Sequence, residues 1–128
     1  MTLSRFGAPL TIYALELFGG KYYIGKTRDL NNQLRRHFRP SDICHGDPCG
    51  VAWLQQWRPM RIDHLYRNAH DLDLDKLTLK YMQKYGINNV RGGTYSSTDL
   101  SVNQMAQIQR RLIYGEDEGV AEKRVLYV

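Results

Sequence analysis

Residues 11–38, TIYALELFGGKYYIGKTRDLNNQLRRHF, decide the fold of this chain. Two segments within it, residues 11–17 and 21–25, are rich in β-branched and aromatic side chains. Residues 18–20, Phe-Gly-Gly, lie between them and supply the backbone freedom that a tight turn needs. The stretch therefore opens with a predicted β-hairpin.

A short amphipathic helix is predicted to follow the hairpin, from Asp29 to Phe38. Apolar residues recur in this segment at helical spacing, and Thr27 or Asp29 can cap its first turn. Pro40 prevents the helix from continuing. Gln33 and His37 are four residues apart, so we expect them to share the helix face turned toward the hairpin.

The rest of the chain predicts further helices and one more strand. The fold class expected from the whole pattern is α+β, a small, mainly antiparallel three-stranded sheet flanked by helices. The expected later elements are a partly helical turn before Pro59, a third strand over residues 60–66, a helix over 71–85, a turn-rich segment over 87–97 and a last helix that opens with a capping box at Ser101.

Length and composition indicate one globular domain over residues 1–128. We expect its core over residues 11–97 and a C-terminal helix and tail over 98–128. The net charge of +5 comes largely from arginine, which favours a nucleic-acid partner. No apolar run is long enough to span a bilayer, and the N-terminus has no secretory signal pattern. We therefore expect no membrane association and an intracellular protein, cytoplasmic or nuclear.

Two tyrosine triplets mark the predicted hairpin, Thr11-Ile12-Tyr13 and Tyr23-Ile24-Gly25. In this order, ahead of a basic helix, they resemble the two half-motifs of the GIY-YIG endonuclease family, whose first half-motif is Gly-Ile-Tyr. Two later blocks, residues 50–62 (GVAWLQQWRPMRI) and 85–96 (YGINNVRGGTYS), extend the resemblance to about residues 11–97, and the second is similar to viral or mobile-element members.

The resemblance implies metal-dependent hydrolysis of a DNA phosphodiester. It assigns Tyr13 as the group that accepts a proton from the attacking water, and it assigns Tyr23 and His37 to orient the water or the phosphate. Lys26 would favour the phenolate form of a neighbouring tyrosine. If the two tyrosines have the same strand parity, both phenols lie on one face of the sheet.

Gln33 stands where the family has its catalytic arginine. An arginine would offer a cation with two parallel donors to the scissile phosphate, whereas glutamine offers a neutral amide. Three explanations are open: an engineered knock-out, a natural member of low activity, or a binding protein that kept the fold and lost the reaction. Of the neighbouring cations, Arg36 can turn toward the site and Arg35 points away.

The resemblance also implies a divalent metal, Mg²⁺ or Mn²⁺, held by a carboxylate on a later helix. Asp75 is the best match in register, with Asp73 as the alternative, although the family has the longer glutamate here. An alternative role for both is to favour the positive end of the helix dipole. Gly25 and Asn89 are the expected supporting residues.

A basic surface around the site is expected to bind the backbone of duplex DNA, including branched or site-specific DNA. The residues assigned to it are Arg28, Arg35, Arg36, Arg39, Arg58 and Arg91. Cys44, His45 and Cys49 supply three ligands of a zinc site that needs four, so reduced loop cysteines are the preferred interpretation.

The function expected from the sequence is a metal-dependent DNA endonuclease, impaired or inactivated by Gln33. The alternative is a catalytically silent module of the same fold that binds DNA or branched structures. A third hypothesis is a basic adaptor that binds protein partners through two exposed tryptophans, Trp53 and Trp57.

Overall fold

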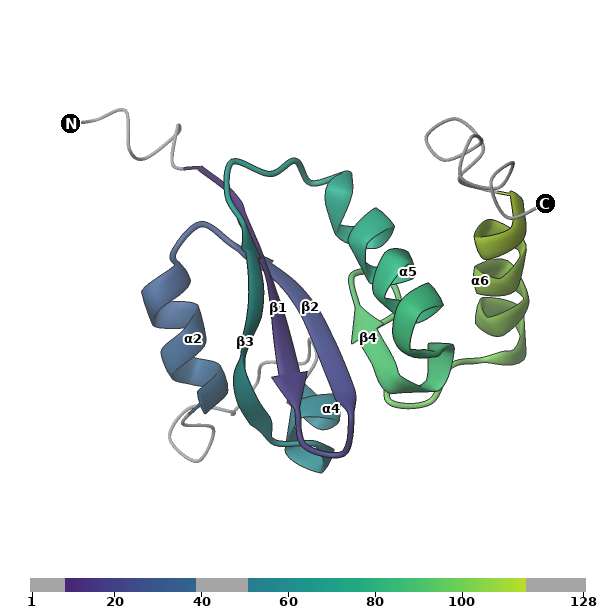
Figure 1. Cartoon of the computed structure of the whole chain (residues 1–128), viewed down its shortest axis with the longest axis horizontal. Coiled ribbons are helices and arrows are strands. Elements are labelled where there is room, and N and C mark those ends of the chain that lie inside the picture. The colour runs from purple at the N-terminus through teal and green to yellow at the C-terminus, as the bar shows by residue number, and fades with distance from the viewer. Residues whose placement is uncertain (1–8, 39–50, 115–128) are drawn as a thin grey trace. The chain divides into compact units, whose positions relative to one another are not determined.

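The computed structural model describes residues 9–38 and 51–114. Its architecture is α+β, as predicted: a mixed four-stranded sheet flanked by helices (Figure 1). The elements are β1 (Thr11–Leu17), β2 (Lys21–Thr27), α2 (Leu30–Phe38), α4 (Val51–Gln56), β3 (Pro59–Tyr66), α5 (Asp73–Tyr85), the 3₁₀ turn η1 (Ile87–Asn89), β4 (Val90–Gly92) and α6 (Val102–Tyr114).

The sheet has the order β3-β1-β2-β4. β1 pairs antiparallel with both β2 and β3, which confirms the three predicted strands, and β4 pairs parallel with β2. The prediction of a three-stranded sheet missed β4, the fourth strand. β4 has only three residues and lies within a glycine-rich segment, so no alternation of side chains in the sequence distinguishes it from a turn.

The β1–β2 register fixes which side chains share a face of the sheet. Tyr13 lies opposite Gly25, and Leu15 lies opposite Tyr23. Directly paired residues and those two apart on one strand point the same way, so Tyr13 and Tyr23 project from one face, as predicted. The turn between the strands uses Gly19 and Gly20 at positive φ, 81° and 74°.

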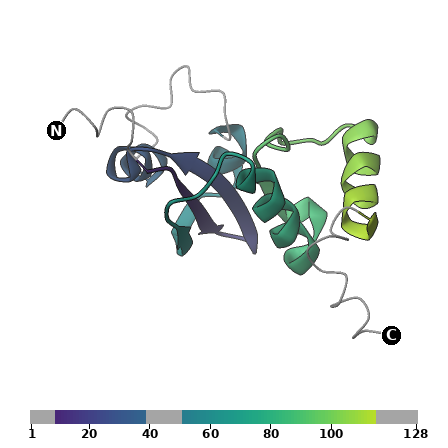
Figure 2. The same cartoon turned by 90° about the horizontal axis from the view of Figure 1, so that it is seen from above.

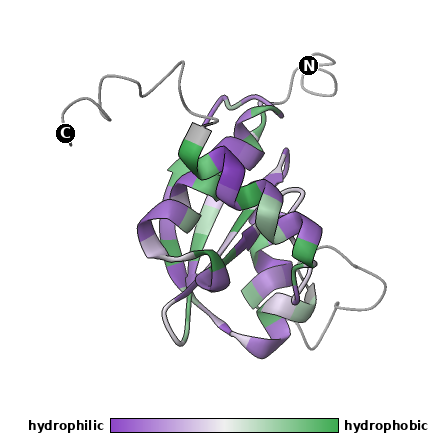
Figure 3. Ribbon diagram, turned by 90° about the vertical axis from the view of Figure 1, so that its right-hand side faces the viewer, coloured by the Kyte–Doolittle hydropathy of each residue, from purple (hydrophilic) through white to green (hydrophobic). Residues whose placement is uncertain are grey.

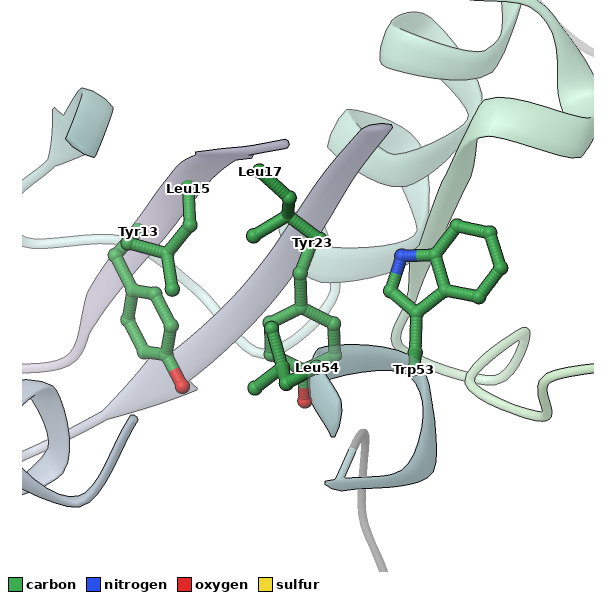
Figure 4. Packing of buried hydrophobic residues seen from close by; sticks show 6 residues of the cluster. All are labelled: Tyr13, Leu15, Leu17, Tyr23, Trp53 and Leu54. Carbon is green, nitrogen blue, oxygen red and sulfur yellow. The ribbon is translucent and has the colours of Figure 1, made fainter. Parts of the chain in front are cut away.

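The tyrosine face of the sheet, defined by Tyr13 and Tyr23, is covered by α2 and α4. Figure 4 shows Tyr13, Leu15, Leu17 and Tyr23 from the hairpin on the same side as Trp53 and Leu54 from α4. Trp53 is buried and donates its indole N–H to the carbonyl of Tyr22 at 3.0 Å. The prediction that Trp53 packs a helix onto the sheet is confirmed. Because Trp53 is buried, the hypothesis of a protein-binding surface built on two exposed tryptophans was wrong for Trp53.

The opposite face of the sheet is covered by α5 (Figure 2). Tyr22, whose parity is opposite to that of Tyr23, stacks on Tyr85 with ring centroids 4.1 Å apart and also meets Tyr81 at 5.6 Å. Residues 79, 81 and 82 of α5 are buried, whereas its lysines are exposed. The sheet therefore separates α2 from α5.

The chain divides into two units, residues 1–98 and 99–128. In the second unit, α6 begins with the predicted capping box: Ser101 Oγ accepts a hydrogen bond from the Gln104 N–H, and Gln104 Oε1 accepts one from the Ser101 N–H.

Hydrophilic and hydrophobic residues alternate along the helices, as expected of amphipathic helices (Figure 3). No helix in the described part of the chain has the length and apolar character to span a membrane.

Candidate active site

Three polar side chains from β1 and α2 meet on the tyrosine face. The Tyr13 hydroxyl lies 2.7 Å from His37 Nε2. The Gln33 amide nitrogen lies 3.4 Å from the Tyr13 hydroxyl oxygen and 3.5 Å from His37 Nε2. The prediction that Gln33 and His37 share the helix face turned toward the hairpin is therefore confirmed.

Tyr23 completes this group from β2. Its ring centroid lies 6.3 Å from that of Tyr13 and 5.6 Å from that of His37, which it meets edge-on. Four predicted site residues, Tyr13, Tyr23, Gln33 and His37, thus lie together although β1 and α2 are separated by the second strand. We call these four residues the tyrosine site.

Gly25 is part of the site because the ring of Tyr13 lies across it. A Cβ at position 25 would lie 2.4 Å from both Cζ and the hydroxyl oxygen of Tyr13. Real side chains do not approach so closely, so any larger residue must displace the phenol. The predicted supporting role of Gly25 has a specific geometric basis: it gives the Tyr13 hydroxyl room to reach His37.

The donors and acceptors of the site indicate where its protons lie. In the tautomer that carries the imidazole proton on Nδ1, His37 Nε2 is an acceptor. The Tyr13 hydroxyl then donates to the same Nε2 and accepts from Gln33. In this arrangement His37 is placed to take the phenol proton of Tyr13.

The site is enclosed by protein. Tyr13 is 1% exposed, and His37 and Tyr23 are each 5% exposed. Electrostatic interactions and hydrogen bonds are stronger in such surroundings than in water, and a buried polar group without a partner is costly. The paired arrangement of Tyr13 and His37 satisfies both groups.

Lys26 does not belong to the tyrosine site. It follows Gly25 and so points to the opposite face, where its ammonium forms an ion pair with Asp71 at 2.9 Å. The hydrogen bond from Lys26, together with its charge, lowers the pKa of the Asp71 carboxyl. The predicted action of Lys26 on a neighbouring phenol was therefore wrong, because adjacent residues of a strand face opposite ways.

The residues proposed as metal ligands do not fit a metal site in this structure. Asp75 Oδ1 accepts a hydrogen bond from the Thr94 N–H at 2.9 Å, and Oδ2 accepts one from the Thr94 hydroxyl at 2.7 Å. Asp73 Oδ2 accepts the backbone N–H of His70, in the turn that precedes α5, at 3.0 Å. Both carboxylates lie on the helix that covers the face opposite the tyrosine site. Across residues 9–38 and 51–114, no group of three or more histidine, cysteine or acidic side chains has metal-binding geometry.

Asn89 and Arg91 support the fold near β4. Asn89 accepts a hydrogen bond from the Lys21 ammonium at 2.8 Å and donates one to the Tyr85 carbonyl. Arg91 is 4% exposed, and its guanidinium lies 4.5 Å above the Trp53 ring. The same guanidinium donates to the carbonyls of Ile87, Val90, Ser97 and Thr98. The prediction that Arg91 contacts nucleic acid from an exposed edge was wrong.

The other arginines predicted to contact DNA differ in exposure, and one of them lies outside the described residues. Arg28, Arg35 and Arg58 are exposed, and Arg36 is half-buried on α2. Arg39 and the segment with Cys44, His45 and Cys49 lie outside the described residues. The exposed part of the predicted surface therefore lies on α2 and just after β2, with Arg58 separate from it between α4 and β3.

Two polar partners in the structure were not foreseen from the sequence, Asp71 and Thr94. Each binds a predicted site residue that is distant in sequence, Lys26 and Asp75 respectively. No local pattern marks such long-range pairs.

Comparisons of the chain with protein-family models, with curated proteins and with solved structures gave no match.

Proposed function

We propose that this protein acts on DNA as a GIY-YIG-type endonuclease whose reaction is limited by Gln33. The observation that supports this most is the hydrogen-bonded group of Tyr13, His37 and Gln33 beside Tyr23. A phenol whose proton can pass to an imidazole is a suitable acceptor for the proton of an attacking water. The exposed Arg28 and Arg35, with the half-buried Arg36, supply positive charge that attracts the phosphodiester backbone.

His37 has a more definite role in this proposal than the sequence suggests. With its Nε2 lone pair directed at the Tyr13 hydroxyl, it accepts the phenol proton as the phenol removes one from water. Tyr23 meets the imidazole edge-on and holds it in this orientation. His37 then acts through Tyr13, whose hydroxyl would take the proton of a water admitted to the enclosed site.

Gln33 leaves the negative charge that develops on the phosphate without a cation. Its amide lies close to both Tyr13 and His37, so the position itself belongs to the site. Loss of one transition-state donor in other enzymes lowers the rate by about 10²–10³. A charged donor is worth more than a neutral one, so the expected deficit is at least of this size.

A divalent cation, if the reaction uses one, would supply charge stabilisation for the leaving oxygen. Because both oxygens of Asp75 are bonded to Thr94, no step is assigned to a metal held by Asp75. Dependence on Mg²⁺ or Mn²⁺ is part of the proposal and is measured directly in the test below.

The test compares the parent with Gln33→Arg in nicking supercoiled plasmid, in Mg²⁺, in Mn²⁺ and in EDTA. Asn32→Arg is the matched control. Asn32 is an exposed neighbour on the same helix, so an arginine there adds the same charge away from the site. We expect Gln33→Arg to raise nicking about 100-fold or more and Asn32→Arg to leave it unchanged. The gain should vanish in Gln33→Arg/Tyr13→Phe. Equal rates for both arginine variants would contradict the nuclease proposal.

A DNA-binding module without catalysis is the second candidate. It is favoured by the neutral amide at position 33 and by the engagement of Asp75 with Thr94. Binding of plasmid or branched DNA without cleavage, in the parent and in Gln33→Arg alike, would favour this candidate. Absence of any salt-sensitive DNA binding would exclude both.

A further inference from the structure

A row of three lysines follows the outer surface of α5. Lys76, Lys80 and Lys84 recur every four residues, and all three side chains are exposed. At 100° per residue they fall within an arc of about 80°. The buried residues Thr78 and Met82 lie on the opposite side of the helix, about 160° from the centre of this arc. We call these three residues the lysine row.

Local acidic groups do not neutralise the lysine row. The acidic residues of α5 are Asp73 and Asp75, and both accept hydrogen bonds at its first turn, from His70 and Thr94. Among the residues that the structure describes, no lysine of the row forms an ion pair. Lys84 lies 5.2 Å from the centroid of the Tyr85 ring, a contact that leaves its charge in place.

The lysine row and the arginines of α2 lie on opposite sides of the sheet. α2 packs on the tyrosine face and α5 packs on the Tyr22 face, as the view from above shows (Figure 2). A rigid sheet separates the two, so a single straight duplex held along α2 does not reach the lysine row. The two basic surfaces are therefore available to different segments of a polyanion.

The length of the lysine row matches a nucleic-acid backbone. Eight residues of α-helix span about 12 Å. One strand of a duplex places a phosphate about every 3.4 Å along its axis, so three or four phosphates lie within that length. Each ammonium of the straight helix α5 can then contact a phosphate oxygen. Such contacts do not depend on the base sequence.

We propose that the lysine row is a second DNA-backbone surface, so that one protein molecule holds two duplex segments, one on each side of the sheet. This inference rests on the proposed function for its first surface, the α2 side. It names the substrate class more closely: DNA in which two helical arms lie near one another, as at a junction or a crossing. The row positions the second arm and takes no part in the chemistry at the tyrosine site.

The experiment measures bridging of two short duplexes, one with a donor and one with an acceptor fluorophore, in EDTA so that no cleavage occurs. We expect energy transfer with the parent and none with Lys76→Gln/Lys80→Gln/Lys84→Gln, which should still bind one duplex. Lys76→Arg/Lys80→Arg/Lys84→Arg is the matched control and should bridge like the parent, because it keeps the charge.

Bridging by the glutamine variant at the parent's level would overturn the proposal, and so would bridging that sedimentation shows to come only from protein dimers. Binding of anionic lipid vesicles or polyglutamate through the lysine row, without duplex binding there, would also overturn it. Nicking by Gln33→Arg separates the two proposals. If that variant cuts DNA while the lysines have no effect on bridging, this inference fails and the nuclease proposal stands.

Discussion

Gly25→Ala tests the geometry of the tyrosine site most directly. The added methyl group would lie 2.4 Å from Cζ and the hydroxyl oxygen of Tyr13, so the ring must move off the strand. Tyr13 is 1% exposed and packed among Leu15, Leu17 and Tyr23, which leaves little room for that movement. The substitution should therefore also break the hydrogen bond between Tyr13 and His37.

The expected magnitude combines two effects. Overpacking of a close-packed core costs about 1–3 kcal/mol. Loss of a buried hydrogen bond adds about 1 kcal/mol. Gly25→Ala should thus lower the free energy of unfolding by about 2–4 kcal/mol, as measured by urea denaturation followed by circular dichroism. Gly20→Asn is the control, since a side chain at Gly20 meets no atom within 4 Å and asparagine tolerates its positive φ.

A double-mutant cycle with Tyr13→Leu shows whether the ring causes the loss. Leucine lacks the distal atoms that the new methyl would meet, so Gly25→Ala should cost less than about 1 kcal/mol in that background. The expected coupling energy is about 1–3 kcal/mol. If the costs of the two substitutions simply add, the reasoning is refuted, because the methyl group would then be acting on something other than the phenol.

Two further predictions concern the α5 side of the sheet. Asp75→Ala removes both hydrogen bonds to Thr94 and should lower the free energy of unfolding by about 1–3 kcal/mol, equally in Mg²⁺ and in EDTA; a loss seen only in Mg²⁺ would instead identify Asp75 as a metal ligand. Burial raises the pKa of Tyr81 well above its usual value, and its hydrogen bonds to Asp63 and Tyr66 raise it further. Stability from this group is therefore complete below about pH 10 and should fall at higher pH, where the unfolded tyrosine ionises and the folded one does not. Urea midpoints from pH 9 to 11 should show a smaller decline in Tyr81→Phe than in the parent, and identical declines would contradict this account.

The hairpin and α2 could be predicted from sequence because their determinants are local. Strand alternation, the Gly19-Gly20 turn and the four-residue spacing of Gln33 and His37 are fixed by neighbouring residues. Once the hairpin pairs, its register brings Tyr13 and Tyr23 to one face, and α2 adds His37 from above. The central part of the candidate site therefore follows from about 28 consecutive residues.

What failed depended on contacts between distant residues. The Lys26 error is an exception, because strand parity, a local rule, already directs Lys26 to the other face, where it meets Asp71. Arg91 is the residue type expected of a DNA contact. Only the structure shows that its guanidinium donates hydrogen bonds to carbonyls within the fold. β4 exists because Val90–Gly92 meets β2, and three residues contain no periodicity to reveal it.

Glutamine at position 33 affects more than the charge of the site. Its neutral amide donates to the Tyr13 oxygen, so the buried Tyr13 and His37 and the half-buried Gln33 form hydrogen bonds with one another without a ligand. An arginine in the same place would bring a cation beside the phenol with no carboxylate among the three, and an entering phosphate would supply the missing anion. The site with arginine is complete only with substrate bound, whereas the site with glutamine is complete alone. In the proposed nuclease, Gln33 would therefore both weaken the chemistry and stabilise the unliganded site through the same contacts.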